Sequence, residues 1–303
     1  YVTLSDAYHG DTIGTVSLGD VPLFHELFKP LLFEPIRFNA PSVHETVYGE
    51  PTANLLQTSL QEFESLLAQN SHQIAALVVE PLIQGAAGIK IHPTGFLRGI
   101  ADLAKQHDIL LIADEVAVGF GRTGKLFACD HEQVDPDILC LGKGLSGGYL
   151  PISATLSNSR IYDAFLGDYD EKKTLFHGHT FAGNPLAAAV SLASLELFES
   201  EQTLARLEPK IEIIKSRIDE LATHPNIQSP RSLGMVAAFD LKVPGGENET
   251  EIGYRFCAEV QKRGVRLRPL GATVIIMPPL VIEESDLHLI FDAIDSTLRA
   301  FAR

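Results

Sequence analysis

Short apolar runs alternate with a helical pattern in the middle of this chain. Residues 74–79 and 109–113 are rich in Ile, Leu and Val and bounded by turn residues, as buried strands of a parallel sheet are. Residues 94–107, between them, repeat apolar side chains at helical spacing. This order predicts a β-α-β unit with two parallel strands. We therefore expect an α/β fold with a mostly parallel central sheet between helices.

Two polar residues follow neighbouring predicted strands. Asp114 ends the run at 109–113, and Lys143 follows the apolar run at 138–141 by two residues. Ligands of open α/β sheets bind at the carboxyl ends of the strands. An amine and a carboxylate at that edge suit pyridoxal phosphate, whose aldehyde needs an amine and whose ring nitrogen needs an acid. Spacing alone leaves an alternative open, in which Asp114 is only a strand-end cap and Lys143 is a solvated cation in a loop.

Two glycine-rich motifs are weaker evidence for a nucleotide. Residues 119–125 match the opening of a phosphate-binding P-loop, but Leu126 stands where Ser or Thr must reach magnesium. Residues 142–147 match a dinucleotide-binding pattern, but residues 148–156 look extended where that motif needs a helix. Neither a nucleotide hydrolase nor a dinucleotide enzyme is expected.

Composition favours small-molecule chemistry. A net charge of −15 opposes binding to nucleic acid or to an anionic membrane, and no run of 18 apolar residues occurs. The three cysteines are widely spaced and give neither a disulfide framework nor a zinc motif. We expect a cytoplasmic protein that acts on small molecules and binds no metal.

The pattern changes after about residue 200. A charged amphipathic segment at 204–221 is followed by predicted strands at 235–241, 265–268 and 273–277 and by a closing helix at 285–301. We predict a large domain over residues 1–200 and a small α+β domain over residues 201–303. Because the chain begins inside a predicted strand, we expect that its N-terminal portion is missing.

One long helix is predicted to be buried. Asn184 is expected to cap it and Pro185 to open it. The small and apolar residues at 186–198 favour a buried position.

Five motifs occur in an order and spacing that resemble the class III, or ω, aminotransferases, which are pyridoxal-phosphate enzymes of fold type I. They lie at residues 8–12, 80–85, 114–124, 141–144 and 177–185. This resemblance implies a large domain that binds pyridoxal 5'-phosphate and a smaller C-terminal domain. It also implies an aminotransferase with two half-reactions, in which the cofactor first takes and then gives the amino group.

Within the family, the resemblance is strongest to members that convert 8-amino-7-oxononanoate to 7,8-diaminononanoate in biotin synthesis. Ala86 and Met277 stand where relatives that use glutamate or ornithine commonly carry Glu and Arg, and Ala117 replaces a common glutamine. Arg268 matches the arginine that holds the distal carboxylate of the substrate. A guanidinium can grip a carboxylate with two parallel hydrogen bonds. Arg266, two residues earlier, is an alternative clamp by strand spacing.

The amino donor stays open between S-adenosylmethionine and lysine. Two rival functions also stay open. One is another ω-aminotransferase that acts on a diamine or an ω-amino acid. The other is a non-catalytic fragment, because the family's N-terminal phosphate loop is not found here.

The resemblance implies a role for each residue around the ring. Lys143 bonds to the aldehyde and, when free, moves the proton. Asp114 pairs with the ring nitrogen, Val116 packs on one ring face, and Tyr8 lies beside the ring and contacts substrate. Asp11 receives a cationic amino group of the donor, or is only a carboxylate at a helix start.

The resemblance at residues 178–180 implies a homodimer with its active site at the subunit interface. Thr180 and the backbone of His179 resemble the segment that reaches the cofactor phosphate of the neighbouring subunit, and Gly178 lets substrate approach the backbone. A metal site at His177 and His179 lacks a third ligand. Three further motif residues are expected to make only structural hydrogen bonds: Glu80, Gln84 and Arg122.

Overall fold

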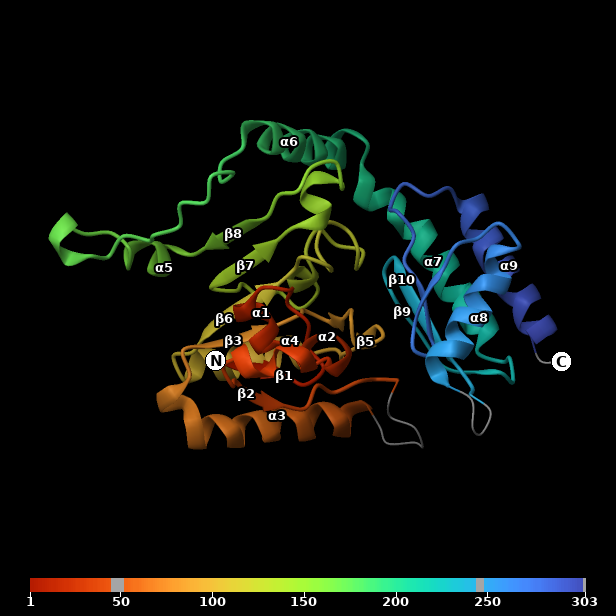
Figure 1. Cartoon of the computed structure of the whole chain (residues 1–303), viewed down its shortest axis with the longest axis horizontal. Helices are drawn as coiled ribbons and strands as arrows, with labels where there is room; N and C mark the ends of the chain where they lie inside the picture. Colours follow the sequence, from red (N-terminus) through yellow and green to blue (C-terminus); the bar gives the residue numbers. More distant parts are fainter. Residues whose placement is uncertain (45–51, 244–247, 302–303) are drawn as a thin grey trace.

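The computed structural model describes residues 1–44, 52–243 and 248–301, and it contains two main sheets (Figure 1). The larger sheet has the strand order β2-β1-β3-β6-β7-β8. These strands are β1 (Val2–Leu4), β2 (Ile36–Phe38), β3 (Ala76–Val79), β6 (Leu110–Asp114), β7 (Ile138–Leu141) and β8 (Ala154–Ser157). Neighbouring strands are parallel except β8, which is antiparallel to β7. The predicted mostly parallel sheet is confirmed.

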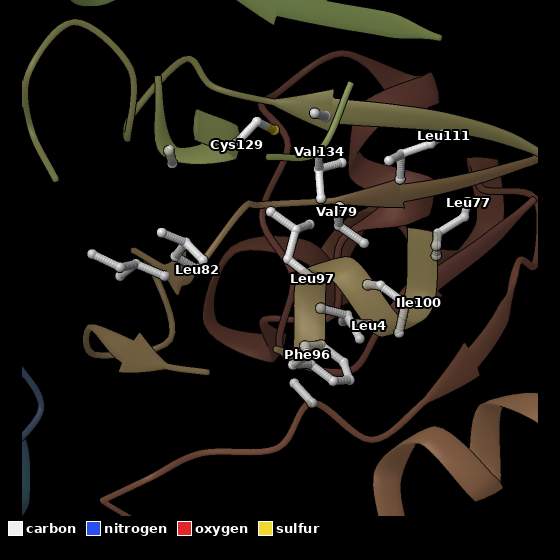
Figure 2. Close-up of a cluster of buried hydrophobic side chains, with 14 of the residues drawn as sticks. Leu4, Leu77, Val79, Leu82, Phe96, Leu97, Ile100, Leu111, Cys129 and Val134 are labelled. Atoms are coloured by element: carbon white, nitrogen blue, oxygen red, sulfur yellow. The ribbon is translucent and has the colours of Figure 1, made fainter. Parts of the chain in front are cut away.

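Helix α4 (Phe96–Gln106) connects β3 to β6 and packs on the sheet. Its residues Phe96, Leu97 and Ile100 are buried against strand residues that include Leu77 and Leu111 (Figure 2). The β-α-β unit thus forms because the apolar stripe of the helix covers the apolar runs of both parallel strands.

The second sheet is antiparallel, with the order β11-β12-β10-β9. Its strands are β9 (Ile227–Leu233), β10 (Val236–Leu241), β11 (Arg268–Leu270) and β12 (Thr273–Ile276). One face packs on α7 (Thr203–Leu221), α8 (Glu249–Gln261) and α9 (Glu284–Phe301). The other face packs on the core of the large sheet, since Val236 and Ala238 belong to that core and Leu233 and Ile275 contact it.

The other elements are short or lie at the surface. They are α1 (Ile13–Leu18), α2 (Pro22–His25), η1 (Glu26–Leu31), α3 (Thr52–Asn70), η2 (Ser71–Gln73), β4 (Ile83–Gln84), β5 (Lys90–Ile91), η3 (Ala128–His131), η4 (Lys143–Ser146), α5 (Ser159–Asp163), η5 (Tyr169–Glu171) and α6 (Pro185–Ser200). No described helix has both the length and the apolar character needed to cross a membrane.

Helix α6 forms as predicted but is not buried within this chain. The side chain of Asn184 accepts from the backbone N–H of Leu186, and Pro185 is the first helical residue. Leu186 and Leu192 are 70% and 62% exposed, and α6 lies along the outer edge of the molecule (Figure 1). The expectation of burial is wrong for the isolated chain, because composition does not tell which surface an apolar helix covers.

The remaining differences concern where elements begin and end. The strand expected at 265–268 is β11, which begins only at Arg268. The boundary proposed at residue 200 lies between α6 and α7, and the division into two domains stays a prediction.

Candidate active site

Asp114 and Lys143 meet at the carboxyl edge of the large sheet. Asp114 is the last residue of β6 and pairs in register with Cys140 of β7. Lys143 follows the end of β7 and begins η4, with a left-handed backbone angle φ of 42°. The adjacent parallel strands therefore deliver an acid and an amine to the same edge, as the apolar runs predict.

The carboxylate of Asp114 is held by two partners. Its Oδ1 accepts from the backbone N–H of Val116 at 3.1 Å, and its Oδ2 accepts from Nδ1 of His9 at 2.8 Å. The side chain of His9 is only 3% exposed and that of Asp114 is 13% exposed. A buried imidazole thus stabilises the negative charge of Asp114 and fixes the direction of its carboxylate.

Val116 lies between Asp114 and the Lys143 turn. A Cβ added to Gly142 would meet Cγ1 of Val116 at 3.2 Å, and one added to Gly144 would meet Cβ of Phe120 at 2.7 Å. The absence of side chains at these two glycines lets the β7–η4 turn approach the loop after β6. The side chain of Lys143 is exposed and makes no hydrogen bond or ion pair with the described residues.

Tyr8 and Asp11 are linked beside this edge. The Tyr8 hydroxyl donates to Oδ1 of Asp11 at 2.8 Å, and its ring stacks on His25 with centroids 5.9 Å apart. Burial, followed by the hydrogen bond to Asp11, raises the pKa of Tyr8. The N-cap of α1 is Thr12, so Asp11 does not cap this helix; its donor-binding role stays a prediction.

Glu80 fixes the backbone that carries Tyr8. Its Oε1 accepts from the Tyr8 N–H at 3.1 Å, and its Oε2 accepts from the Gly85 N–H at 2.9 Å. The side chain is almost completely buried, and burial raises its pKa to about 7. Gln84, also buried, donates through Nε2 to the carbonyl of Ser5 at 2.8 Å. Both residues make the structural hydrogen bonds expected of them.

Arg268 lies on the face of the second sheet that turns toward the large sheet. It pairs with Ile275, which pairs in turn with Ala238. Directly paired residues project from the same face of a sheet, and both partners contact the core of the large sheet. Arg268 begins β11 with an exposed side chain, whereas Arg266 precedes the strand. The geometry therefore favours Arg268 over Arg266 as the carboxylate clamp, a role that stays a prediction.

Gly178, His179 and Thr180 lie in an exposed segment, away from the edge at Asp114. The chain runs outward after β8 through α5 and returns to α6 (Figure 1). All residues from 171 to 183 are exposed, and a Cβ at Gly178 would meet no atom within 4 Å. The chain does not bring these three residues to its own Asp114 and Lys143, and their role stays a prediction.

The P-loop-like motif at 119–125 joins the two sheets. Arg122 donates through Nη1 to the carbonyls of Met235 and Pro278 at 3.1 and 2.7 Å. Burial lowers the pKa of Arg122 to about 10, so it stays charged at neutral pH. A Cβ at Gly121 would meet side chains of Leu204, Leu207 and Leu280 within 3.3 Å. Glycines of this motif allow close packing between the loop and the C-terminal part of the chain. This role accounts for the glycine pattern without a phosphate-binding serine.

His9 is the site residue that sequence reasoning missed. It stands in the motif at residues 8–12, but its partner Asp114 is 105 residues away. A histidine directly beside the predicted Tyr8 is the signal that could have found it.

The cysteines do not supply a nucleophile at this edge. The three cysteines are unpaired, and burial raises the pKa of Cys140 and of Cys257 to about 11. Thiols with such values are poor nucleophiles at neutral pH. Within residues 1–44, 52–243 and 248–301, no group of three or more His, Cys, Asp or Glu could hold a metal ion.

Known proteins share both the sequence and the fold. The family model described as aminotransferase class-III matches residues 1–298. Adenosylmethionine-8-amino-7-oxononanoate aminotransferase of Geobacter sulfurreducens is 45% identical over 305 residues, covering 98% of this chain and 67% of the relative. Across eight curated relatives of this name, the chain spans between 56% and 68% of their length.

Two solved structures extend the comparison. The crystal structure of adenosylmethionine-8-amino-7-oxononanoate aminotransferase from Methanocaldococcus jannaschii is 37% identical, with a TM-score of 0.89, and the match covers 99% of this chain and 67% of that one. The omega transaminase from Pseudomonas jessenii in complex with PMP is 29% identical, with a TM-score of 0.92 and the same coverage of 99% and 67%. The chain belongs to the class III aminotransferases.

Proposed function

We propose that this protein transfers an amino group to 8-amino-7-oxononanoate and so forms 7,8-diaminononanoate in biotin synthesis. The amino donor in this proposal is S-adenosylmethionine or lysine. The observation that carries it is the meeting of Asp114 and Lys143 at one sheet edge, with Arg268 on the facing side of the second sheet. The shared name of the curated relatives supports the choice of substrate.

Class III aminotransferases use pyridoxal phosphate, and the residues at this edge fit that group. Asp114 presents a carboxylate held by His9, Lys143 presents an amine without a competing partner among the described residues, and Val116 offers an apolar surface near both. When bound, the cofactor supplies an electron-withdrawing ring and an aldehyde that reacts with amines.

Each side chain then has a defined role. Lys143 would hold the cofactor through its aldehyde, and its free amine would move a proton to and from the reacting carbon of the substrate. Asp114 would face the ring nitrogen and favour its protonated form. Arg268 holds the distal carboxylate of the substrate and sets the distance between that end and the ketone. Tyr8 and Asp11, which are hydrogen-bonded to each other beside this edge, would contact the amino donor.

We propose further that the protein acts as a cytosolic homodimer. The exposed segment with Thr180 and His179 extends away from the chain's own Asp114, so it can reach a second copy. The leucines of α6 supply exposed apolar surface that a partner would cover. The unpaired cysteines fit a reducing compartment.

The substrate assignment can be tested with an arginine pair. We expect Arg268→Ala to lower kcat/KM for 8-amino-7-oxononanoate about ten- to a hundredfold, because the charge-assisted hydrogen bonds to the carboxylate are lost. The matched control, Arg266→Ala, removes an exposed arginine two residues earlier and should change kcat/KM less than about twofold. Steady-state kinetics of both holoenzyme variants provide the measurement.

The donor is tested by single half-reactions followed through the visible absorbance of the cofactor. S-adenosylmethionine or lysine should convert it faster than 4-aminobutyrate or ornithine. The opposite order would favour another ω-aminotransferase. Borohydride reduction followed by peptide mapping should place the cofactor on Lys143, and a label elsewhere would contradict the proposal, as would protein that stays colourless with added cofactor.

A further inference from the structure

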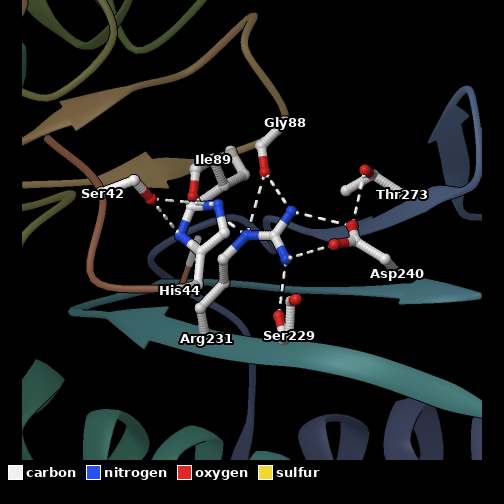
Figure 3. A network of polar contacts seen from close by, with 8 residues as sticks. All are labelled: Ser42, His44, Gly88, Ile89, Ser229, Arg231, Asp240 and Thr273. Atoms are coloured by element: carbon white, nitrogen blue, oxygen red, sulfur yellow. Dashed lines mark hydrogen bonds and ion pairs between the residues drawn. The ribbon is translucent and has the colours of Figure 1, made fainter. Parts of the chain in front are cut away.

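Arg231 of β9 forms a buried polar network at the junction of the two sheets (Figure 3). Its side chain is 4% exposed. Its guanidinium donates to the carbonyl of Gly88 at 2.5 and 3.1 Å and to that of Ile89 at 3.1 Å. Two further N–H groups contact the two carboxylate oxygens of Asp240 at 2.9 and 3.1 Å. One side chain therefore joins the second sheet to the turn between β4 and β5.

The network continues along the second sheet. Thr273 of β12 donates to Oδ1 of Asp240 of β10 at 2.7 Å. On the other side, Ile83, Ile89 and Ile91 of the β4–β5 hairpin are buried in the core of the large sheet. Arg231 thus connects a turn that is anchored in one core to three strands of the other sheet.

Arg231 and Arg268 occupy one row across the second sheet. The register pairs Arg231 with Ala238, Ala238 with Ile275, and Ile275 with Arg268. Members of such a row share a face, and three strand spacings separate the ends by about 14 Å. Arg231 and Arg268 therefore lie on the same face of this sheet, at its two opposite edges, and directly paired strands connect them.

The chemistry of the network requires arginine. A planar guanidinium can reach two backbone carbonyls and both oxygens of a carboxylate at once, whereas an ammonium on a flexible stem cannot. His44 lies in the same network, where burial, followed by the charge of Arg231, lowers its pKa to about 4. His44 therefore adds no positive charge beside Arg231 at neutral pH, and its ring accepts or donates a hydrogen bond with Ser42 at 2.8 Å.

We propose that Arg231 is a positioning residue for substrate recognition: by holding the second sheet on the Gly88–Ile89 turn, it sets where Arg268 grips the distal carboxylate. This inference rests on the proposed function. Arg122 attaches the same sheet at Met235, and Val236 and Ala238 pack on the core of the large sheet, so the second sheet stays attached when Arg231 is lost but no longer has its contact with the Gly88–Ile89 turn. The expected consequence is a misplaced clamp.

The test compares the keto acid with its methyl ester in the holoenzyme. We expect Arg231→Met to lower kcat/KM for 8-amino-7-oxononanoate about tenfold to a hundredfold, as misplacement by about 1 Å would. For the methyl ester, which lacks the charge that Arg268 grips, the change should stay below about twofold. Arg231→Lys should fall between Arg231→Met and the wild type.

A double variant shows whether Arg231 acts through Arg268. If it does, Arg231→Met combined with Arg268→Ala should lose no more than Arg268→Ala alone, within about twofold. The matched control is Arg217→Met. Arg217 is also largely buried, but it contacts Asp292 and Glu220 among the helices of the other face. Its loss should leave the ratio of acid to ester unchanged.

Each outcome decides the inference. Additive losses in the double variant, or equal losses on acid and ester, would overturn it. If Arg231→Met does not fold, Thr273→Val removes only the hydroxyl that supports Asp240 and should shift the acid-to-ester ratio in the same direction by a smaller factor; an unchanged ratio would reject the inference. A wild type that converts neither compound would instead refute the proposed function.

Discussion

His9 holds the carboxylate on which the proposed cofactor site depends. Its imidazole pairs with Asp114 at 2.8 Å and is almost fully buried. We expect His9→Phe to weaken the binding of pyridoxal phosphate about tenfold or more, because the Asp114 carboxylate loses the buried hydrogen bond that fixes its direction. A titration of the apoprotein with pyridoxal phosphate, followed by absorbance, measures the dissociation constant.

The control is His131, a partly buried histidine that contacts the 119–125 loop. His131 contacts Oγ1 of Thr123 at 3.2 Å and has no contact with Asp114 among the described residues. His131→Phe should leave the dissociation constant within about twofold of the wild type. Equal weakening by both substitutions would show that His9 has only a structural effect.

Single residues differed in how far the sequence could predict them. Asp114 and Lys143 follow strands that hydrophobic patterning identifies, so their shared edge was predictable. His9 was not, because its contact with Asp114 depends on which strands become neighbours. Strand spacing placed Arg268 and Arg266 on one face, and only the family resemblance favoured Arg268; the register adds that Arg268 belongs to the strand and Arg266 precedes it.

Gly234 packs directly on the backbone of the 119–125 loop, where the two sheets meet. Its φ is +60°, and a Cβ there would meet backbone atoms of Thr123 at 2.3 and 2.5 Å. We expect Gly234→Ala to lower the free energy of unfolding by more than about 4 kcal/mol, because the backbone of the 119–125 loop cannot move aside. Chemical denaturation of the two proteins gives this difference.

Gly264 is the matched control, because it shares the left-handed conformation without the close contact. Its φ is +87°, and a Cβ would meet no atom within 4 Å. Gly264→Ala should therefore cost only about 1–2 kcal/mol, the ordinary penalty for a side chain in this region. Similar losses at both positions would show that backbone conformation, not the clash, dominates.

Helices and strands were predictable where one periodicity decided them. Helix α4 and strands β3 and β6 lie within a few residues of the predicted bounds. Helix α6 shows the limit: its sequence predicted both the cap and an apolar surface, but not that the chain itself leaves this surface exposed. An apolar helix surface indicates a contact with another surface, and the helix sequence does not identify that surface.

The order of the strands in the whole molecule lay beyond the sequence pattern. Strand β1 lies between β2 and β3 in the sheet, although both of these strands follow it along the chain. Such crossovers depend on long-range packing, which local periodicity does not encode. The way the second sheet packs on the first through Arg231 and Arg122 belongs to the same class of information.

The stability of the whole molecule should depend on pH through buried groups with opposite effects. Burial, followed by the charge of Lys90, lowers the pKa of His92 from 6.5 to about 3. Between these values the unfolded chain binds a proton that the folded chain excludes, so the contribution of His92 is lost as pH falls from 6.5 toward 3. Burial raises the pKa of Glu80 from 4.5 to about 7, so its contribution is instead lost as pH rises from 4.5 to 7.

The two effects can be separated by substitution at His92. This ring is buried, contacts Oε1 of Gln84 at 3.4 Å and lies edge-on to Phe96. As the pH falls from 6.5 to about 3, we expect the free energy of unfolding to decrease less in His92→Gln than in the wild type. The two decreases should differ by a few kcal/mol, because each pKa unit corresponds to about 1.4 kcal/mol. Denaturant titrations across this range measure both slopes. As a control, His72→Gln changes an exposed histidine and should keep the wild-type dependence of unfolding free energy on pH. If His92→Gln also kept it, protonation of His92 would not drive the acid transition.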